Sequence, residues 1–155
     1  MSLVIGIDPG ASGAIVVLDQ SGKYMGGVQM PTVKVGKSTR VNGAAVASFL
    51  RVHDIVGAHA YLEQVGAMPG QGVTSMFSFG HAAGVVEGIL QGLVIPYTLV
   101  TPQAWKKTAG LIGSDKDAAR SRAIQLYPEL RILDQKAKGQ AVADALLIAR
   151  HGAGI

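Results

Sequence analysis

The chain opens with two apolar runs separated by a tight turn, and this feature constrains the fold more than any other. Leu3–Asp8 and Ala14–Asp19 are almost wholly apolar, and the glycine-rich turn 10–13 lies between them. A third extended segment, 23–30, follows a second turn. Short apolar runs bounded by glycine turns are typical of buried strands. The opening of the chain therefore predicts an antiparallel meander of three strands.

Downstream of the meander, helical and extended patterns alternate. Strands are expected at 58–63 and 94–100, each after a helical segment. Parallel strands need such crossovers, so these two strands extend the meander into a mixed sheet. Gly80, Gly84 and Gly88 fall four residues apart, on one helix face that another element can approach closely. The expected helices span 42–51, 76–91, 102–108, 115–127 and 140–150.

The ends of these helices carry local signals. Asn42 precedes the first helix as an N-cap, and Thr101 precedes the third, which has proline in its first turn. Ser114 and Asp117 have the spacing of a capping box, and Gly152 is expected just past the last helix. The elements together predict an α/β fold: a mixed five-stranded sheet, an antiparallel meander plus parallel strands, flanked by helices.

Length and composition limit the classes of function. The 155 residues suffice for a single domain, 1–155, and 48% apolar against 15% charged residues is the composition of a folded body. A formal net charge of +4 favours a polyanionic partner. The chain has no cysteine, which excludes disulfides, thiol catalysis and cysteine-ligated zinc. No signal-like stretch and no run near ~18 apolar residues is found, so we expect a cytoplasmic protein with no membrane partner.

Three acids occupy positions suited to chemistry. Asp8 and Glu63 each end an apolar strand, and the carboxyl ends of neighbouring parallel strands meet where open α/β sheets hold their ligands. Asp144 stands alone among apolar residues of the last helix, so a core-facing carboxylate there must be neutral, paired or metal-bound. The plainer alternatives are a strand or turn cap for Asp8 and Glu63 and a solvent-facing position for Asp144.

Three converging carboxylates without histidine or cysteine suit a hard cation. Magnesium prefers carboxylate oxygens, and manganese accepts the same ligands, whereas zinc favours nitrogen and sulfur. Two such ions, ~3.5–4 Å apart, supply what phosphodiester hydrolysis needs, an activated water and charge neutralisation at the attacking and leaving oxygens. The acids therefore predict Mg²⁺ as cofactor, two ions per site, with Mn²⁺ as a substitute.

Four segments of the chain resemble one family of nucleases. VIGIDPGASGAIVVLD resembles the opening of the RuvC branch of the RNase H-like nucleases, YLEQVGAMPGQGVTSMFSFG the segment around that family's second acid, and VADALLIA its closing motif. IPYTLVTPQAWKKTAGLIGSDKDAARSRAIQLYP resembles the family's strand, basic turn and helix. The match is in order and covers nearly the whole chain. The MPGQG variant is more similar to phage-type members than to the bacterial housekeeping ones.

The resemblance implies an RNase H-like fold and a homodimeric, metal-dependent endonuclease. Such an enzyme resolves Holliday junctions, the four-way branches of DNA recombination and repair, by symmetric nicks; we expect 5′-phosphate and 3′-hydroxyl ends. It would act in a bacterial cell or a phage-infected host, and the sequence names no branch-migration partner. The resemblance assigns Asp8, Glu63 and Asp144 as metal ligands and Lys107 and Lys116 as catalytic residues that contact phosphate near the cut.

One position departs from the family pattern. Members usually carry another acid or a histidine three or four residues before the last acid, and here Ala141 and Gln140 stand there. Three alternatives follow. Gln140 is the fourth ligand or holds a water, Asp134 swings in from the preceding loop, or the site uses three acids alone.

The glycine-rich segment after Glu63 is expected to contact branched DNA. A loop of this kind that opens a helix suits phosphate binding, and a protruding aromatic side chain can wedge between bases. Phe77 and Phe79 are two apart on a helix and cannot face the same way, so we expect one to protrude and one to pack in the core. The residues expected to bind DNA are Gly70, Gln71, Gly72, Ser75, Phe77, Lys106, Lys107, Lys116 and Lys138.

The basic stretch 32–40 lacks periodicity and is expected to be an exposed loop. Its cations, Lys34, Lys37 and Arg40, either form an arm on duplex DNA or are merely solvated.

Three other functions stand as alternatives. An RNase H-like nuclease that acts on flaps, forks or hybrids would share the fold and the acids. A catalytically inactive junction-binding protein would account for the missing fourth acid. A sugar or acetate kinase of the actin-like superfamily has an opening like IGIDPGASGAIVVLD, but such enzymes use two lobes, a longer chain and a second phosphate loop that this sequence does not show.

Overall fold

The computed structural model describes residues 2–155 and is built on one mixed sheet of five strands in the order β3-β2-β1-β6-β7. The first three strands form the expected antiparallel meander. β1 then pairs in parallel with β6, which pairs in parallel with β7. The predicted fold class is confirmed. The strands are β1 (Leu3–Asp8), β2 (Ala14–Asp19), β3 (Tyr24–Gln29), β6 (His59–Glu63) and β7 (Tyr97–Val100).

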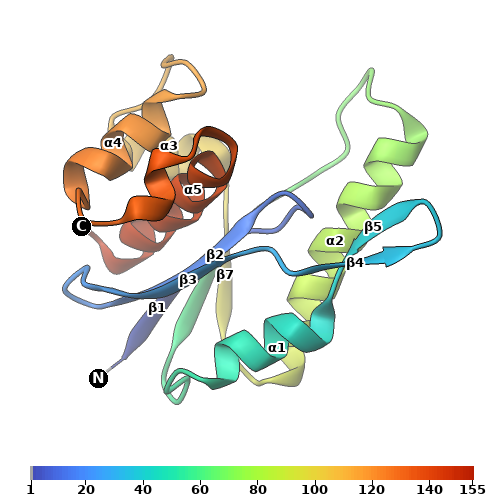
Figure 1. The fold of residues 1–155 in the computed structure, drawn as a ribbon, viewed down its shortest axis with the longest axis horizontal. Coiled ribbons are helices and arrows are strands. Elements are labelled where there is room, and N and C mark those ends of the chain that lie inside the picture. The colour runs from blue at the N-terminus through green and yellow to red at the C-terminus, as the bar shows by residue number, and fades with distance from the viewer. Residues whose placement is uncertain (1) are drawn as a thin grey trace.

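Helices cover both faces of this sheet (Figure 1). On one face, two helices pack over a core of large aliphatic side chains that includes Ile5, Ile7 and Leu62. On the other face, the last helix lies along β1 and β2 over a second core that includes Val4 and Val16. The first pair is α1 (Gly43–Arg51) and α2 (Val73–Gly92); the second group is α3 (Pro102–Ala109), α4 (Ala118–Leu126), the 3-10 turn Arg131–Asp134 and α5 (Lys136–Ala153).

The N-caps of α1 and α3 follow the signals in the sequence, but the capping box predicted for α4 does not form. The Asn42 side chain accepts a hydrogen bond from the backbone of the first turn of α1 (3.2 Å), and Thr101 caps α3 in the same way. The capping box predicted for Ser114 and Asp117 is wrong. α4 begins only after Asp117, and the Asp117 side chain makes no cap hydrogen bond. Its carboxylate instead accepts a hydrogen bond from Arg120 (3.0 Å).

α5 is longer than the predicted 140–150. Gly152 does not end the helix: it lies within the last turn, packed closely on the ring of Tyr61. The left-handed cap falls at Gly154 (φ 76°). Packing against the sheet therefore decides which of the two glycines ends the helix.

The basic stretch after Pro31 is not a loop, which corrects the prediction. β4 (Thr32–Val35) and β5 (Ser38–Val41) form an antiparallel hairpin with a two-residue turn. Gly36 takes the positive φ (60°) that the first position of such a turn requires. Each strand has only four residues, so its alternation is too short to distinguish it from a loop in the sequence.

α2 begins earlier than predicted, and most of its surface is exposed. Phe77 (63% exposed) and Phe79 (43% exposed) both lie in its exposed first turns, so the prediction that one of them packs in the core is wrong. The stripe of Gly80, Gly84 and Gly88 is open, with nothing within 4 Å of where a Cβ would stand. Within the described chain, no other element makes the close approach that this stripe permits.

α2 is also long and apolar enough to cross a bilayer, with a mean hydropathy of 1.2. α2 reaches this value without a continuous run of about 18 apolar residues, because Ser78, His81 and Glu87 interrupt it. Core helices of soluble proteins pass the same test, and α2 packs on the sheet through Ala82, Val86 and Leu90.

Helix α5 approaches the sheet very closely at Gly6 in β1. A Cβ on Gly6 would stand 2.1 Å from the carbonyl oxygen of Ala145 and 2.5 Å from the backbone nitrogen of Ala149. Only glycine leaves room for a backbone at this distance. The backbone of α5 is thereby set directly on β1, close to the end of the strand at Asp8.

Replacing Gly6 with alanine should lower the free energy of unfolding by at least about 2 kcal/mol, because α5 must move off the sheet to admit the methyl group. The matched control is Gly66→Ala, where nothing lies within 4 Å of the new Cβ. The control should change stability by no more than about 0.5 kcal/mol. Urea unfolding measures both, and equal stabilities would mean that α5 does not rest on Gly6.

Candidate active site

Asp8 and Glu63 lie side by side at the carboxyl ends of two neighbouring strands. β1 and β6 run parallel with Ile7 paired to Leu62, so the next residue on each strand is the acid. Because side chains alternate along a strand, Asp8 points to the same face as Gly6, the face that α5 covers. By the same alternation Glu63 shares the face of Tyr61. The structure brings these two acids together, as the sequence predicts.

Asp144 reaches the same place from the helix above. Its neighbour Ala145 rests on Gly6, which holds Asp144 over the end of β1. The charges of Asp8 and Glu63 both act on the Asp144 carboxyl group. The solvent-facing alternative for Asp144 therefore does not describe this structure.

Burial raises the pKa of all three carboxyl groups. Loss of water, followed by repulsion from Asp8 and Glu63, raises the pKa of Asp144 to about 7. Loss of water and repulsion from Glu63 raise the pKa of Asp8 to about 6, although the backbone N–H of Gly10 opposes the rise. Burial also raises the pKa of Glu63. Acids that lose water and repel one another form a site that a bound cation would stabilise.

Trp105 holds Glu63 in place, a contact that the sequence did not reveal. The indole Nε1–H donates a hydrogen bond to Oε2 of Glu63 (2.6 Å), and this bond lowers the pKa of the glutamate against the effect of burial. Trp105 is only 2% exposed. A buried indole N–H needs a hydrogen-bond acceptor. This rule is the one signal in the sequence that could have suggested a polar partner for Trp105.

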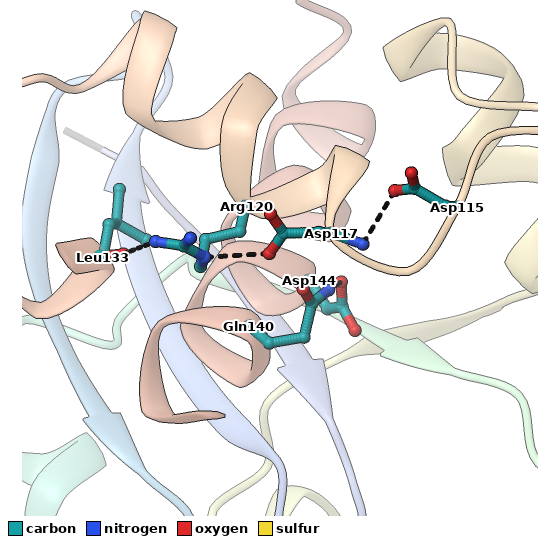
Figure 2. A network of polar contacts seen from close by, with 6 residues as sticks. All are labelled: Asp115, Asp117, Arg120, Leu133, Gln140 and Asp144. Atoms are coloured by element: carbon teal, nitrogen blue, oxygen red, sulfur yellow. Dashed lines mark hydrogen bonds and ion pairs between the residues drawn. The ribbon is translucent and has the colours of Figure 1, made fainter. Parts of the chain in front are cut away.

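Gln140, one of the candidates for a fourth ligand, contacts Asp144. Its side-chain Nε2 donates a hydrogen bond to Oδ1 of Asp144 (3.1 Å), one turn along α5 (Figure 2). Asp134, the other candidate for a fourth ligand, forms an exposed ion pair with Arg131 (3.2 Å). The geometry therefore favours Gln140 over Asp134 as the residue that acts on the acids.

A polar network fixes the helix beside this site. Arg120 of α4 pairs with Asp117 (3.0 Å) and donates to the carbonyl oxygen of Leu133 (2.8 Å), while Asp115 accepts a hydrogen bond from the Asp117 N–H (3.0 Å) (Figure 2). These contacts tie the turn before α4 to the segment that leads into α5.

A cavity of about 220 Å³ opens on the α3 side of the acids, and we call it the lysine cavity. Lys106 and Lys116 line it together with Asp115, Gln140 and Asp144. The charge of Lys106 acts on both Glu63 and Asp144 and opposes the rise of their pKa values. The cavity therefore offers cations next to the acids, as a phosphate-binding site requires.

A larger groove of about 510 Å³ opens on the α2 side, and we call it the hydroxyl groove. Asp8 and Glu63 form part of its wall, and Phe79 stands on the α2 side. Between them the groove is lined by glycines of the β1–β2 turn and by four hydroxyl groups, those of Ser12, Thr39, Ser75 and Ser78. The acids thus lie between two concavities of different chemistry.

The other residues that the sequence singled out are only partly gathered here. Lys106 and Lys116 line the lysine cavity and Ser75 lines the hydroxyl groove, whereas Lys107 and Lys138 are exposed and line neither. The loop residues Gly70, Gln71 and Gly72 are exposed ahead of α2, and Phe77 is exposed on its first turns.

The donor set suits a hard divalent cation, although the acids are not gathered around one point. Within residues 2–155, no three His, Cys, Asp or Glu side chains stand close enough together to enclose an ion as they are placed. Glu63 is held by Trp105 and Asp144 by Gln140, and mutual repulsion opposes any closer approach. Ligands that offer only oxygen atoms, and whose negative charge is compensated only in part, match the preference of magnesium.

Comparison with solved structures identifies the fold. RuvC of T. thermophilus in complex with Holliday junction substrate aligns with a TM-score of 0.56 and 19% identity, over 97% of this chain and 92% of that one. The Thermus thermophilus RuvC structure aligns with a TM-score of 0.56 and 18% identity, over 96% and 92% of the two chains. No family model and no curated protein matches the chain. The chain therefore has the RuvC-like, RNase H-like fold that its sequence predicted.

The raised pKa values predict how stability depends on pH without metal. A carboxyl group whose pKa is raised on folding favours the folded state when protonated. This contribution is complete below the ordinary value of 3.8 and is lost as the pH rises through about 6 for Asp8 and about 7 for Asp144. In EDTA at pH 8, the free energy of unfolding of Asp144→Asn should therefore exceed that of the wild type by about 1–2 kcal/mol. This difference is smaller than the full pKa shift of Asp144 implies, because solvent reaches the site.

Thermal unfolding in EDTA from pH 4 to pH 8 measures this difference, which should grow with pH and amount to several degrees at pH 8. The control is Glu129→Gln, which removes an exposed carboxylate outside the site and should show no such trend. A difference between Asp144→Asn and the wild type that stays constant with pH would contradict the electrostatic description of the site.

Proposed function

We propose that this protein is a structure-specific endonuclease that resolves Holliday junctions by metal-dependent nicking. The observation that carries the proposal is that Asp8, Glu63 and Asp144 lie near one another at one edge of a RuvC-like sheet, where burial raises the pKa of all three carboxyl groups and Lys106 compensates their charge only in part. The lysines of the adjacent cavity supply the positive charge that a phosphodiester substrate needs.

Branched DNA is the substrate that the comparison favours. The solved structure of RuvC with a Holliday junction aligns over nearly the whole of both chains. The net charge of +4 is compatible with DNA as the partner. We infer a four-way junction, with flaps, forks and hybrids as the alternatives that an assay must separate.

Asp8, Glu63 and Asp144 would hold the magnesium ions. Bound there, the ions would supply an activated water and stabilise charge on the leaving oxygen. Trp105 keeps one Glu63 oxygen oriented, and Gln140 does the same for Asp144. Lys106 and Lys116 would bind the non-bridging oxygens of the phosphate that is cut.

The reaction adds water across one phosphodiester bond. The water oxygen bonds to phosphorus, the bond from phosphorus to the 3′ oxygen breaks, and that oxygen ends with a proton. The products are a 5′ phosphate and a 3′ hydroxyl, ends that a ligase can join.

Symmetric cutting of a four-way junction needs two sites, and we propose that a homodimer provides them. α2 carries an exposed apolar face with the open stripe Gly80, Gly84 and Gly88, which would admit a second helix at short distance. The same face explains why a helix with mean hydropathy of 1.2 is so little buried in one chain.

Cleavage of a labelled four-way junction, beside a linear duplex and a flap, tests the function. The wild type should nick the junction symmetrically with Mg²⁺ or Mn²⁺ and not with EDTA, while Asp8→Asn, Glu63→Gln and Asp144→Asn should each cut at least about a hundredfold more slowly. Glu87→Gln is the matched control, since Glu87 binds Tyr97 (3.0 Å) outside the site. Tight junction binding without cutting in either metal would instead identify a junction-binding protein.

Sedimentation tests the dimer. The molecular mass of the wild type from sedimentation should be about twice the 16.0 kDa of one chain. Gly84→Glu should have the mass of a monomer, because it places a charge on the apolar face. Glutamate is a better helix former than glycine by about 0.5–1 kcal/mol, so the variant should fold. Ser121→Glu, which adds the same charge to the exposed surface of α4, should stay dimeric. A wild type that remains monomeric when bound to junction DNA would exclude the dimer.

A further inference from the structure

Across residues 2–155, the lining of the hydroxyl groove carries no positive charge to neutralise the phosphates of a DNA strand. Asp8 and Glu63 lie in its wall, and among the described residues that line it there is no lysine or arginine. Serine and threonine hydroxyls can donate hydrogen bonds to phosphate, but they do not neutralise its charge. A DNA strand that approached the acids along this groove would therefore need a cation from its rim.

The β4–β5 hairpin places one cation there. Thr39 of β5 lines the groove, and it is paired across the hairpin with Lys34 of β4. The Lys34 ammonium group donates a hydrogen bond to Oγ1 of Thr39 (2.7 Å). Paired residues of an antiparallel ladder share one face, so Lys34 lies on the face of the hairpin that carries Thr39 to the groove.

The opposite face of the hairpin fixes its position. Val33 pairs with Arg40 on that face, and the Arg40 guanidinium lies over the ring of Phe77 on α2, 5.4 Å from its centre. At the base of the hairpin Val41, which lies on the same face as Lys34 and Thr39, is also buried, at 6% exposed. Figure 1 shows the hairpin beside α2. The hairpin is thus held against α2, and Lys34 is more closely constrained than a lysine on a solvated loop.

We propose that Lys34, oriented by Thr39, binds a backbone phosphate of the DNA strand that is cut, at a position in the hydroxyl groove away from the cleaved phosphate. This inference rests on the proposed function for the identity of the ligand. The strand would cross the acids between two sources of positive charge, Lys34 on the α2 side and the lysine cavity on the α3 side. Lys34 binds DNA in this description, and Thr39 is a positioning residue that acts through it.

Binding of a labelled four-way junction by the full chain in EDTA, over a range of salt concentrations, tests the inference independently of metal and of cutting. Lys34→Gln should raise Kd about five- to tenfold near 0.15 M salt and reduce the slope of log K against log salt by about 1, as the loss of one phosphate contact requires. Thr39→Val, which removes the hydroxyl group that holds Lys34, should raise Kd by a smaller factor, about two- to fourfold.

Lys37→Gln is the matched control. Lys37 carries the same charge on the same hairpin. It is the second residue of the two-residue turn, directly after Gly36, and is exposed. It should change Kd less than twofold and leave the salt slope intact. Equal effects of Lys34→Gln and Lys37→Gln would show only a diffuse influence of charge and would overturn the assignment.

Neutral methylphosphonates placed singly along the cut strand locate the contact. One position, other than the cleaved phosphate, should weaken binding by the wild type and have no further effect on Lys34→Gln. If every position weakens both proteins alike, Lys34 does not bind a particular phosphate and the inference fails. If the wild type cuts junctions and Lys34→Gln binds them as tightly as the wild type, only this inference is overturned. If the wild type binds no junction, the proposed function is overturned as well.

Discussion

The contact between the backbone of α5 and Gly6 is the constraint on which the rest of the site depends. Glycine at this position lets Ala145 and Ala149 rest directly on β1. A helix so placed must project Asp144 toward the end of the strand, where Asp8 stands. Any larger side chain at Gly6 would push α5 outward and draw the third acid away from the first two. A packing requirement inside the fold thereby sets the geometry of a functional site.

The site that results is electrostatically unfavourable in the protein by itself. Three acids share a region with little water, and the pKa values of Asp8 and Asp144 rise to about 6 and about 7. The neighbouring residues limit this cost in different ways: Trp105 and Gln140 donate hydrogen bonds to carboxylates, and Lys106 supplies charge. Such an arrangement lowers stability in the absence of a ligand, and sites that bind cations commonly accept that cost.

The part of the molecule that extends from the sheet differs in character from the site. The first turns of α2 and the β4–β5 hairpin are exposed and meet at Arg40 and Phe77. Exposed aromatic rings, cations and hydroxyl groups gathered beside an acid cluster form the kind of surface that nucleic acids contact. The open glycine stripe of α2 adds a face suited to close helix packing.

The sequence by itself determined the mixed sheet of a three-strand meander plus parallel strands and the two acids at strand ends, because apolar runs between turns and acids after strands are local signals. It also indicated the RuvC-like fold through segments spread along the chain, whereas the phage-type likeness stays a prediction. Only the tertiary structure decided that Trp105 binds Glu63, that Gln140 binds Asp144, that 32–41 forms a hairpin and that Phe77 and Phe79 are both exposed. Each of these depends on which distant elements pack together, and contacts between residues far apart in the chain leave no periodic or local pattern in the sequence.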